Sequence, residues 1–114
     1  MRQIILDTNF ILTCLNQKID FFEEIPLMGI SILVPEKVIT ELERLKKGLA
    51  LRLLEKEKNK FKRIFIAGKN TDNAIIKYAR ENPKLIVATL DRGIQRKVKN
   101  QKMIIRNKKK LEIM

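Results

Sequence analysis

The sequence predicts an α/β fold in which a parallel β-sheet is covered by helices on both faces. Short runs rich in Ile and Val alternate with segments of helical periodicity along the chain. These runs are apolar at consecutive positions, as expected for strands that are buried on both faces. A length of 114 residues, 45% of them hydrophobic, suits one domain with one core. Helical connections between such strands favour right-handed crossovers and parallel pairing.

The alternation gives five expected strands and six expected helices. The strands are expected at residues 3–6, 31–34, 64–67, 85–90 and 103–105. The helices are expected at residues 8–16, 20–25, 36–47, 49–60, 72–81 and 92–99. Pro35, Gly48 and Pro83 lie where helix start and stop signals belong. Residues 1–106 are expected to form the domain, and residues 107–114 a basic tail that is either frayed or an RNA-binding arm.

The chain is strongly basic, and its charge is unevenly distributed. Twenty-five Lys and Arg residues against 13 Asp and Glu residues give a net charge of +12, which favours a polyanionic partner such as RNA. Residues 1–45 carry four basic and seven acidic residues, whereas residues 46–114 carry twenty-one and six. A basic surface is therefore expected from the second part of the chain. Few aromatic residues interleave the basic runs, so phosphate contacts rather than base stacking are expected.

The composition excludes several kinds of site. The chain has no His, which excludes a Ser/His/Asp triad, a His general base and a His zinc site. The single Cys14 excludes an internal disulfide and is expected in the core. No apolar run reaches the roughly 20 residues that span a bilayer, and the N-terminus lacks a signal-peptide pattern, so no membrane partner and a cytoplasmic location are expected.

Three of the four aspartates follow predicted strands. Asp7 and Asp91 come directly after strands, and Asp72 follows another strand after a short loop. Since the carboxyl ends of parallel strands meet at one edge of a sheet, all three are expected there. The helix at residues 36–47 brings Glu41 or Glu43 to the same region, and its periodicity does not distinguish them.

This acidic set has two interpretations. Each aspartate stands at a helix start, where Asp is a favoured N-cap, although Thr8 and Thr71 compete for that role. Helix capping alone does not explain why these carboxylates lie together at one edge of a Lys-rich protein, so the set as a whole favours a metal site. Carboxylate oxygens, without His or paired Cys, select Mg²⁺ or Mn²⁺. Such a site on a basic scaffold indicates phosphodiester hydrolysis.

Four motifs resemble those of PIN-domain ribonucleases, in the same order and spacing. They are residues 5–9 (ILDTN), 34–42 (VPEKVITEL), 71–75 (TDNAI) and 87–91 (VATLD). Residues 7–10 (DTNF), 20–24 (DFFEE), 41–43 (ELE) and 89–92 (TLDR) are most similar to the branch related to the small-subunit ribosomal RNA processing endonuclease. VapC-type toxins are near neighbours.

The resemblance implies a three-layer α/β/α sandwich and cleavage of single-stranded RNA with Mg²⁺ or Mn²⁺. It implies that the catalytic and metal-binding set is Asp7, Glu41, Asp72 and Asp91. It implies supporting hydrogen bonds from Thr8, Asn9 and Thr89. The candidate RNA contacts are Lys69, Arg92, Arg96 and Lys97.

Three functional hypotheses follow. The first is a metal-dependent endoribonuclease in ribosomal RNA processing. The second is a VapC-type toxin ribonuclease with a small acidic protein partner, and the third is a non-catalytic RNA-binding assembly subunit. A haloacid-type phosphatase is disfavoured because the second aspartate of that motif and a Gly-rich phosphate loop are both missing. The apolar residues Phe21, Phe22, Leu27 and Met28 fit either a homodimer interface or core packing.

Overall fold

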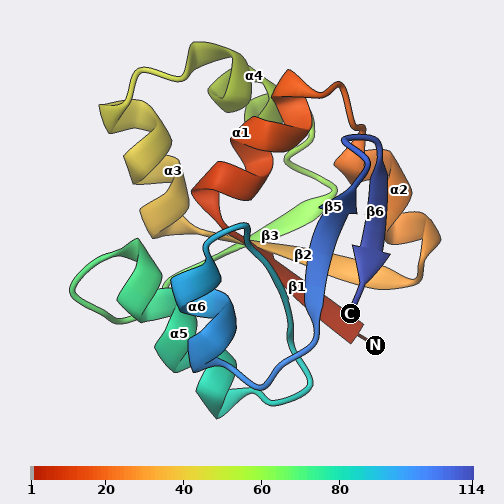
Figure 1. Cartoon of the computed structure of the whole chain (residues 1–114). Helices are drawn as coiled ribbons and strands as arrows, with labels where there is room; N and C mark the ends of the chain where they lie inside the picture. Colours follow the sequence, from red (N-terminus) through yellow and green to blue (C-terminus); the bar gives the residue numbers. More distant parts are fainter. Residues whose placement is uncertain (1) are drawn as a thin grey trace.

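A six-stranded β-sheet with helices on both faces forms the fold in the computed structural model, which describes residues 2–114 (Figure 1). The strands are β1 (Arg2–Leu6), β2 (Ile30–Pro35), β3 (Phe61–Ile64), β4 (Ile86–Ala88), β5 (Lys102–Arg106) and β6 (Lys110–Ile113). The helices are α1 (Thr8–Asn16), α2 (Phe21–Leu27), α3 (Glu36–Arg44), α4 (Gly48–Lys56), α5 (Thr71–Glu81) and α6 (Arg92–Lys97). The strand order is β3-β2-β1-β4-β5-β6. All neighbouring strands pair in parallel except β5 and β6.

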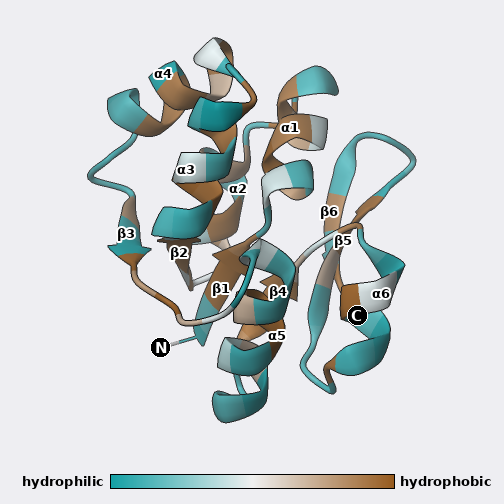
Figure 2. Ribbon diagram, turned by 90° about the vertical axis from the view of Figure 1, so that its left-hand side faces the viewer, coloured by the Kyte–Doolittle hydropathy of each residue, from teal (hydrophilic) through white to brown (hydrophobic). Residues whose placement is uncertain are grey.

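Two hydrophobic clusters lie on opposite faces of the sheet. Successive residues of β1 alternate between them, so that Ile4 and Leu6 pack with α1 to α4 whereas Ile5 packs with α5 and α6. Figure 2 shows the brown, hydrophobic strands between helices whose outer surfaces are largely teal. This arrangement confirms the predicted three-layer α/β/α sandwich and explains why the central strands are apolar at consecutive positions.

The edge strand β3 lies three residues before its predicted position. It covers Phe61–Ile64 instead of residues 64–67 and pairs with β2, with Ile64 beside Pro35. An edge strand has a neighbouring strand on one side only and can carry charged residues, and Lys62 and Arg63 are both exposed. The apolar run after it includes Ile66, which is buried in the loop that leads to α5.

The expected basic tail is instead part of the sheet. Asn107 and Lys108 both adopt positive φ values, 54° and 59°, in a tight turn of the kind that joins antiparallel strands. Strand β6 then pairs antiparallel with β5, and its Leu111 is buried in the core. The expectation of a frayed tail or a free arm was therefore wrong for residues 107–114, because alternate apolar residues follow the lysine run.

Helices α3 and α4 end earlier than expected, at Arg44 and Lys56 instead of residues 47 and 60. Lys46 has a φ of 57°, which ends the helical conformation before Gly48. The predicted apolar surface near α2 divides in two: Phe21 and Phe22 are buried, whereas Leu27 and Met28 are 78% and 41% exposed. A homodimer interface there stays a prediction.

Cys14 lies in the core, as expected, and is fully buried. Burial raises the pKa of its thiol to about 12, and Glu24 contributes to the same direction. None of the helices in residues 2–114 combines the length and apolar character needed to cross a membrane.

The parallel strands direct their carboxyl ends to one edge of the sheet. Strand β1 leads into α1, β2 into α3 and β4 into α6, so three helix starts gather at that edge. Helix α5 begins at the same side after the loop from β3 (Figure 1). This edge therefore receives the acidic residues that follow the strands.

Candidate active site

Asp7 lies at the centre of the site, between β1 and α1. Its backbone N–H donates to the Ala88 carbonyl over 3.0 Å, which extends the pairing of β1 with β4 by one residue. The residue is only 4% exposed. Its Oδ1 accepts from the Thr8 backbone N–H at 2.8 Å, and its Oδ2 accepts from the Thr89 hydroxyl at 2.8 Å. Both carboxylate oxygens are thus fixed by the protein.

The electrostatics around Asp7 oppose ionisation. Burial raises the pKa of the Asp7 carboxyl from 3.8 to about 6, although hydrogen bonds from Thr89 and Thr8 act in the opposite direction. The charges of Asp72 and Glu41 raise this pKa further, which places both carboxylates close enough to interact with Asp7. A positive charge among these groups would relieve the repulsion.

Thr89 connects Asp7 with Asp91. Its fully buried hydroxyl donates to Asp7 and accepts from the Asp91 backbone N–H at 3.1 Å. Asp91 is the N-cap of α6, and its Oδ1 accepts from the Gly93 and Ile94 N–H groups at 2.7 and 3.2 Å. The capping interpretation of Asp91 therefore holds without separating it from the acidic set.

Glu41, rather than Glu43, faces the site. The Thr8 hydroxyl donates a short hydrogen bond to Glu41 Oε1, whereas Glu43 is exposed. Arg44 Nη2 lies 3.8 Å from Glu41 Oε2 on the outer side. Thr8 therefore links two of the predicted acidic residues, since its N–H contacts Asp7 and its hydroxyl contacts Glu41.

Asp72 is the exposed member of the set. The N-cap of α5 is Asn70, whose side chain accepts from the Asn73 N–H at 2.9 Å, so neither Thr71 nor Asp72 serves as the cap. Partial burial raises the pKa of Asp72, and the charges of Asp91 and Glu41 add to that effect, whereas Lys97 lowers it. Asp72 is thus within electrostatic reach of each of the other three predicted acidic residues.

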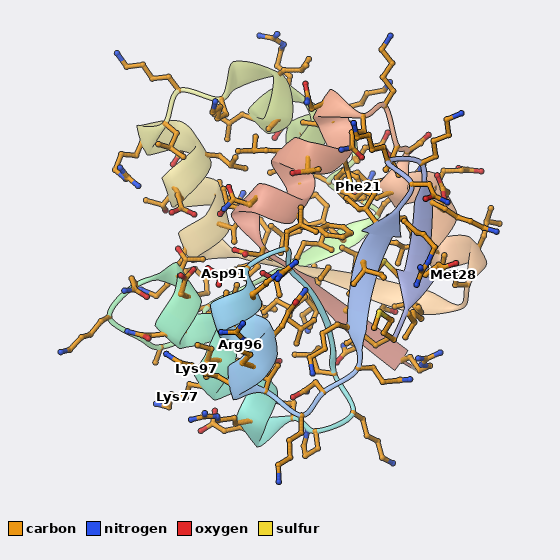
Figure 3. The ribbon with its side chains drawn as sticks, in the orientation of Figure 1. Phe21, Met28, Lys77, Asp91, Arg96 and Lys97 are labelled. Atoms are coloured by element: carbon orange, nitrogen blue, oxygen red, sulfur yellow. The ribbon has the colours of Figure 1, made fainter. Side chains whose placement is uncertain are left out.

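The predicted RNA contacts lie around the outside of this set. Figure 3 shows Asp91 at the start of α6, with Arg96 and Lys97 further along the helix and Lys77 of α5 on the same side. Lys69 and Arg92 are exposed. Asn9 is exposed as well, and the supporting hydrogen bond expected from it stays a prediction. Phe21 and Met28 lie across the molecule from Asp91 (Figure 3).

Two residues that the sequence did not single out shape the site. One is Asn70, the cap that leaves Asp72 free. The other is Gln95, whose Nε2 donates to the Thr89 carbonyl at 2.9 Å and holds the turn between β4 and α6. Asn directly before a Thr at a helix start is a recognisable capping signal, but no sequence pattern identifies Gln95.

A family model described as a PIN like domain matches residues 4–110, nearly the whole chain and all four acidic positions. The chain belongs to the PIN-like domain family. This confirms the family that the four motifs predicted.

Two curated relatives and one solved structure have similar sequences. Ribonuclease VapC4 of Methanocaldococcus jannaschii is 35% identical, and the alignment covers 99% of this chain and 97% of that protein. The rRNA-processing protein fcf1 of Schizosaccharomyces pombe is 33% identical over 84% of this chain, which spans about half (53%) of that protein. The PIN domain endonuclease Utp24 has a TM-score of 0.80 and 30% identity, with 97% of this chain and 90% of that chain covered.

The donor set of this PIN-like domain fits a hard divalent cation in its chemistry. Asp7, Glu41, Asp72 and Asp91 provide carboxylate oxygens, which suit Mg²⁺ or Mn²⁺. Within residues 2–114, no three carboxylates converge on a single point in the side-chain conformations present. Asp7, Asp91 and Glu41 are held by hydrogen bonds, so the exposed Asp72 is the side chain most free to adjust.

Proposed function

We propose that this chain is an endoribonuclease that hydrolyses phosphodiester bonds of single-stranded RNA at the acidic site, with Mg²⁺ or Mn²⁺ as cofactor. The observation that carries the proposal is the gathering of Asp7, Glu41, Asp72 and Asp91 at one sheet edge of a chain with net charge +12. Keeping a carboxylate as buried as Asp7 next to other acids destabilises the fold, so a structural role alone does not account for it. The ribonuclease named among its relatives supports the same activity.

Each protein group has a distinct part in this function. A divalent ion held by the carboxylates would supply Lewis acidity, which activates water and neutralises phosphate charge. Asp7 provides the fixed ligand, because hydrogen bonds orient both of its oxygens. Thr8 and Thr89 set the spacing from Asp7 to Glu41 and to Asp91. Glu41 and Asp72 complete the set from the solvent side.

The cations near the site are suited to hold the substrate. Lys97 lies close enough to Asp72 to lower its pKa, so a phosphate bound by Lys97 would be adjacent to the acidic set. Arg92, Arg96 and Lys69 are exposed around the same edge. We propose that these four residues contact RNA phosphates, which would make binding strongly dependent on salt concentration.

The test is cleavage of an end-labelled, largely single-stranded RNA with EDTA, Mg²⁺ or Mn²⁺. We expect cleavage with either metal, none with EDTA, and none by the Asp7→Asn variant. RNA binding by that variant should be unchanged or tighter, because repulsion of the phosphate decreases. Equal cleavage by the variant would refute the proposal.

A non-catalytic RNA-binding subunit is the alternative. It predicts salt-sensitive RNA binding that no metal affects. Thermal stabilisation by Mn²⁺ that is lost in Asp72→Asn would count against this alternative.

The two curated relatives suggest two different biological roles for this chain. A role in ribosomal RNA processing is suggested by the fcf1 similarity, and a toxin role by the VapC4 similarity. We propose the former on the basis of the motifs that surround Asp7, Glu41 and Asp91. Growth arrest on expression, relieved by a small acidic protein encoded next to the gene, would instead establish the toxin role.

A further inference from the structure

A groove of about 450 Å³ runs beside the acidic site, between α3 and the start of α5. Glu41 and Thr71 form part of its wall, so one end of the groove reaches the acidic set. Glu36 forms part of the wall as well, and it lies at the start of α3, directly after β2. The groove thus leads from the acidic site toward the β3 edge of the sheet.

The groove is basic despite its acidic end. Lys37, Arg44 and Lys69 all line it. Arg44 has Glu41 as a distant partner at 3.8 Å, whereas Lys37 and Lys69 belong to no ion pair within residues 2–114. Cations without carboxylate partners beside an acidic site are available to bind an anion. Lys37 lies on α3 and Lys69 in the loop before α5, so cations line the groove from two different elements, as suits a chain of phosphates.

An exposed phenylalanine follows the strand that borders this region. Phe65 is 86% exposed, whereas Phe10, Phe21 and Phe22 are buried. Ile64 and Ile66 both pack into the cluster beneath α5, so the alternation of the chain places Phe65 on the opposite face, where α3 lies. Ile64 of β3 pairs with Pro35 of β2, and the next residues along the two segments are Phe65 and Glu36. Phe65 therefore lies beside Glu36, which lines that end of the groove.

The loop that carries Phe65 and Lys69 is held in place. Gly68 packs so closely on α5 that a Cβ there would lie 2.6 Å from the Ala74 backbone. The Asn70 cap fixes the end of the loop. On the other side of Phe65, Arg63 forms a bidentate ion pair with Glu36, with a closest distance of 2.6 Å. The exposed ring is therefore presented from a defined backbone rather than from a loose loop.

We propose that this groove binds unpaired nucleotides that flank the bond to be cleaved, with phosphates on Lys37 and Lys69 and a base stacked on Phe65. The inference rests on the proposed function for the position of the cleaved bond. An aromatic ring stacks any base, but only a base that is not paired in a duplex can turn onto it. Phe65 would therefore favour single strands over duplexes, which the basic groove alone would not.

The test is equilibrium binding in EDTA, where no cleavage is expected. The probe is a fluorescein-labelled RNA of alternating adenine and cytosine, about twelve nucleotides long, alone or annealed to its complement. We expect Phe65→Ala to weaken single-strand binding by about tenfold and duplex binding by less than about twofold. Phe65→Tyr should retain the affinity. Leu27→Ala is the matched control, because Leu27 is similarly exposed at the opposite edge of the sheet.

The lysines provide an independent readout. Lys37→Ala and Lys69→Ala should each reduce the dependence of log affinity on log salt by about one, whereas Phe65→Ala should leave that slope unchanged. Equal affinity of the wild-type chain and Phe65→Ala for the single strand would overturn the inference, as would no binding by the wild-type chain.

The two proposals can fail separately. If the wild-type chain cleaves RNA with metal but Phe65→Ala binds as tightly, the nuclease proposal stands and the groove inference is wrong. If Phe65→Ala weakens binding but no metal supports cleavage by the wild-type chain, the groove inference stands and the chain is a binding subunit. Circular dichroism melting of each variant shows whether its fold is intact.

Discussion

The acidic site has an inner half and an outer half that differ in how firmly they are held. The inner half consists of Asp7, Thr89 and Asp91, which are linked by hydrogen bonds across the ends of β1 and β4. The outer half consists of Asp72, Lys69 and Lys97. Lys69 and Lys97 are exposed, and Asp72 makes no contribution to the cap of α5.

The two halves therefore control different properties. The inner half fixes the positions of the carboxylates, and the outer half affects the affinity for metal and substrate. The inner carboxylate is placed by the sheet itself, and it opposes folding because its pKa is raised to about 6. The outer residues lie at the start of α5, at the end of α6 and in a loop, where they can adjust to metal and substrate at little cost in folding free energy. We therefore expect substitutions in the inner half to have large effects on both stability and cleavage, and those in the outer half to have smaller, salt-dependent effects.

The largest effect is expected when an aspartate of the inner half is replaced, and the matching variant in the outer half gives the comparison. Asp7→Asn should lower the cleavage rate by at least about a hundredfold at every Mn²⁺ concentration, because its oxygens are fixed and nothing replaces them. Asp72→Asn should be partly rescued by more Mn²⁺, since neighbouring exposed groups or water can take its place. Cleavage rates measured over a Mn²⁺ titration test this, and equal rescue of both variants would remove the distinction.

The second-largest effect concerns how the free energy of unfolding depends on pH in the absence of metal. The folded-state pKa of Asp7, about 6, exceeds its ordinary value of 3.8, so the folded state binds the proton more tightly. Wild-type stability should therefore fall as the pH rises from about 4 to about 6, by about 3 kcal/mol from this group. Asp7→Asn should lack this loss and be more stable than the wild-type chain near pH 7.

Urea unfolding in EDTA, followed by circular dichroism, measures this difference. Asp20→Asn is the matched control, because Asp20 caps α2 from an exposed position. If the stabilisation by Asp7→Asn near pH 7 is no larger than that by Asp20→Asn, burial of Asp7 does not oppose folding.

A moderate effect is expected from the hydroxyl that joins the inner residues. Thr89→Val keeps the shape but removes the donor to Asp7 and the acceptor for the Asp91 N–H. The pKa of Asp7 should rise further, and the acidic limb of the cleavage profile should move to higher pH, with about a tenfold lower rate. Thr89→Ser should restore the profile. A pH profile unchanged in Thr89→Val would mean that Thr89 does not orient Asp7.

The smallest effect is expected at the outer cation. Lys97→Ala should weaken RNA binding by about threefold at low salt, and the difference should vanish at high salt, because an exposed charge is screened. Lys84→Ala, on an exposed residue just before β4 and at the opposite edge, is the control. A salt-independent loss in Lys97→Ala would indicate that Lys97 does more than attract phosphate.

The sequence was sufficient to predict the central fold. Strands β1, β2 and β4 each contain consecutive buried apolar residues, Ile4–Leu6, Ile32–Val34 and Ile86–Ala88, and their pairing follows from the crossover rule. It was not sufficient at the edges, where β3 includes Lys62 and Arg63 and where β6 begins at Lys110, the last residue of a lysine run. Edge strands have a neighbouring strand on one side only and tolerate charged residues, so their composition resembles that of loops.

The site was also predictable in outline. Residues that directly follow a strand, such as Asp7 and Asp91, are placed by the sheet topology alone. Glu41 and Glu43 could not be distinguished on the helix itself, because the choice depends on where Thr8 lies. The freedom of Asp72 depended on which of three consecutive polar residues caps α5, and that choice is set by the loop from Gly68 to Asn70.

The buried thiol of Cys14 makes the chain convenient for chemical labelling. With its pKa near 12 and no solvent contact, the only native cysteine should not react with maleimides at neutral pH while the fold is intact. A cysteine introduced at Lys69 or Lys97 would then be the single reactive position. Spectroscopic probes can therefore be attached at either position without first removing a native cysteine.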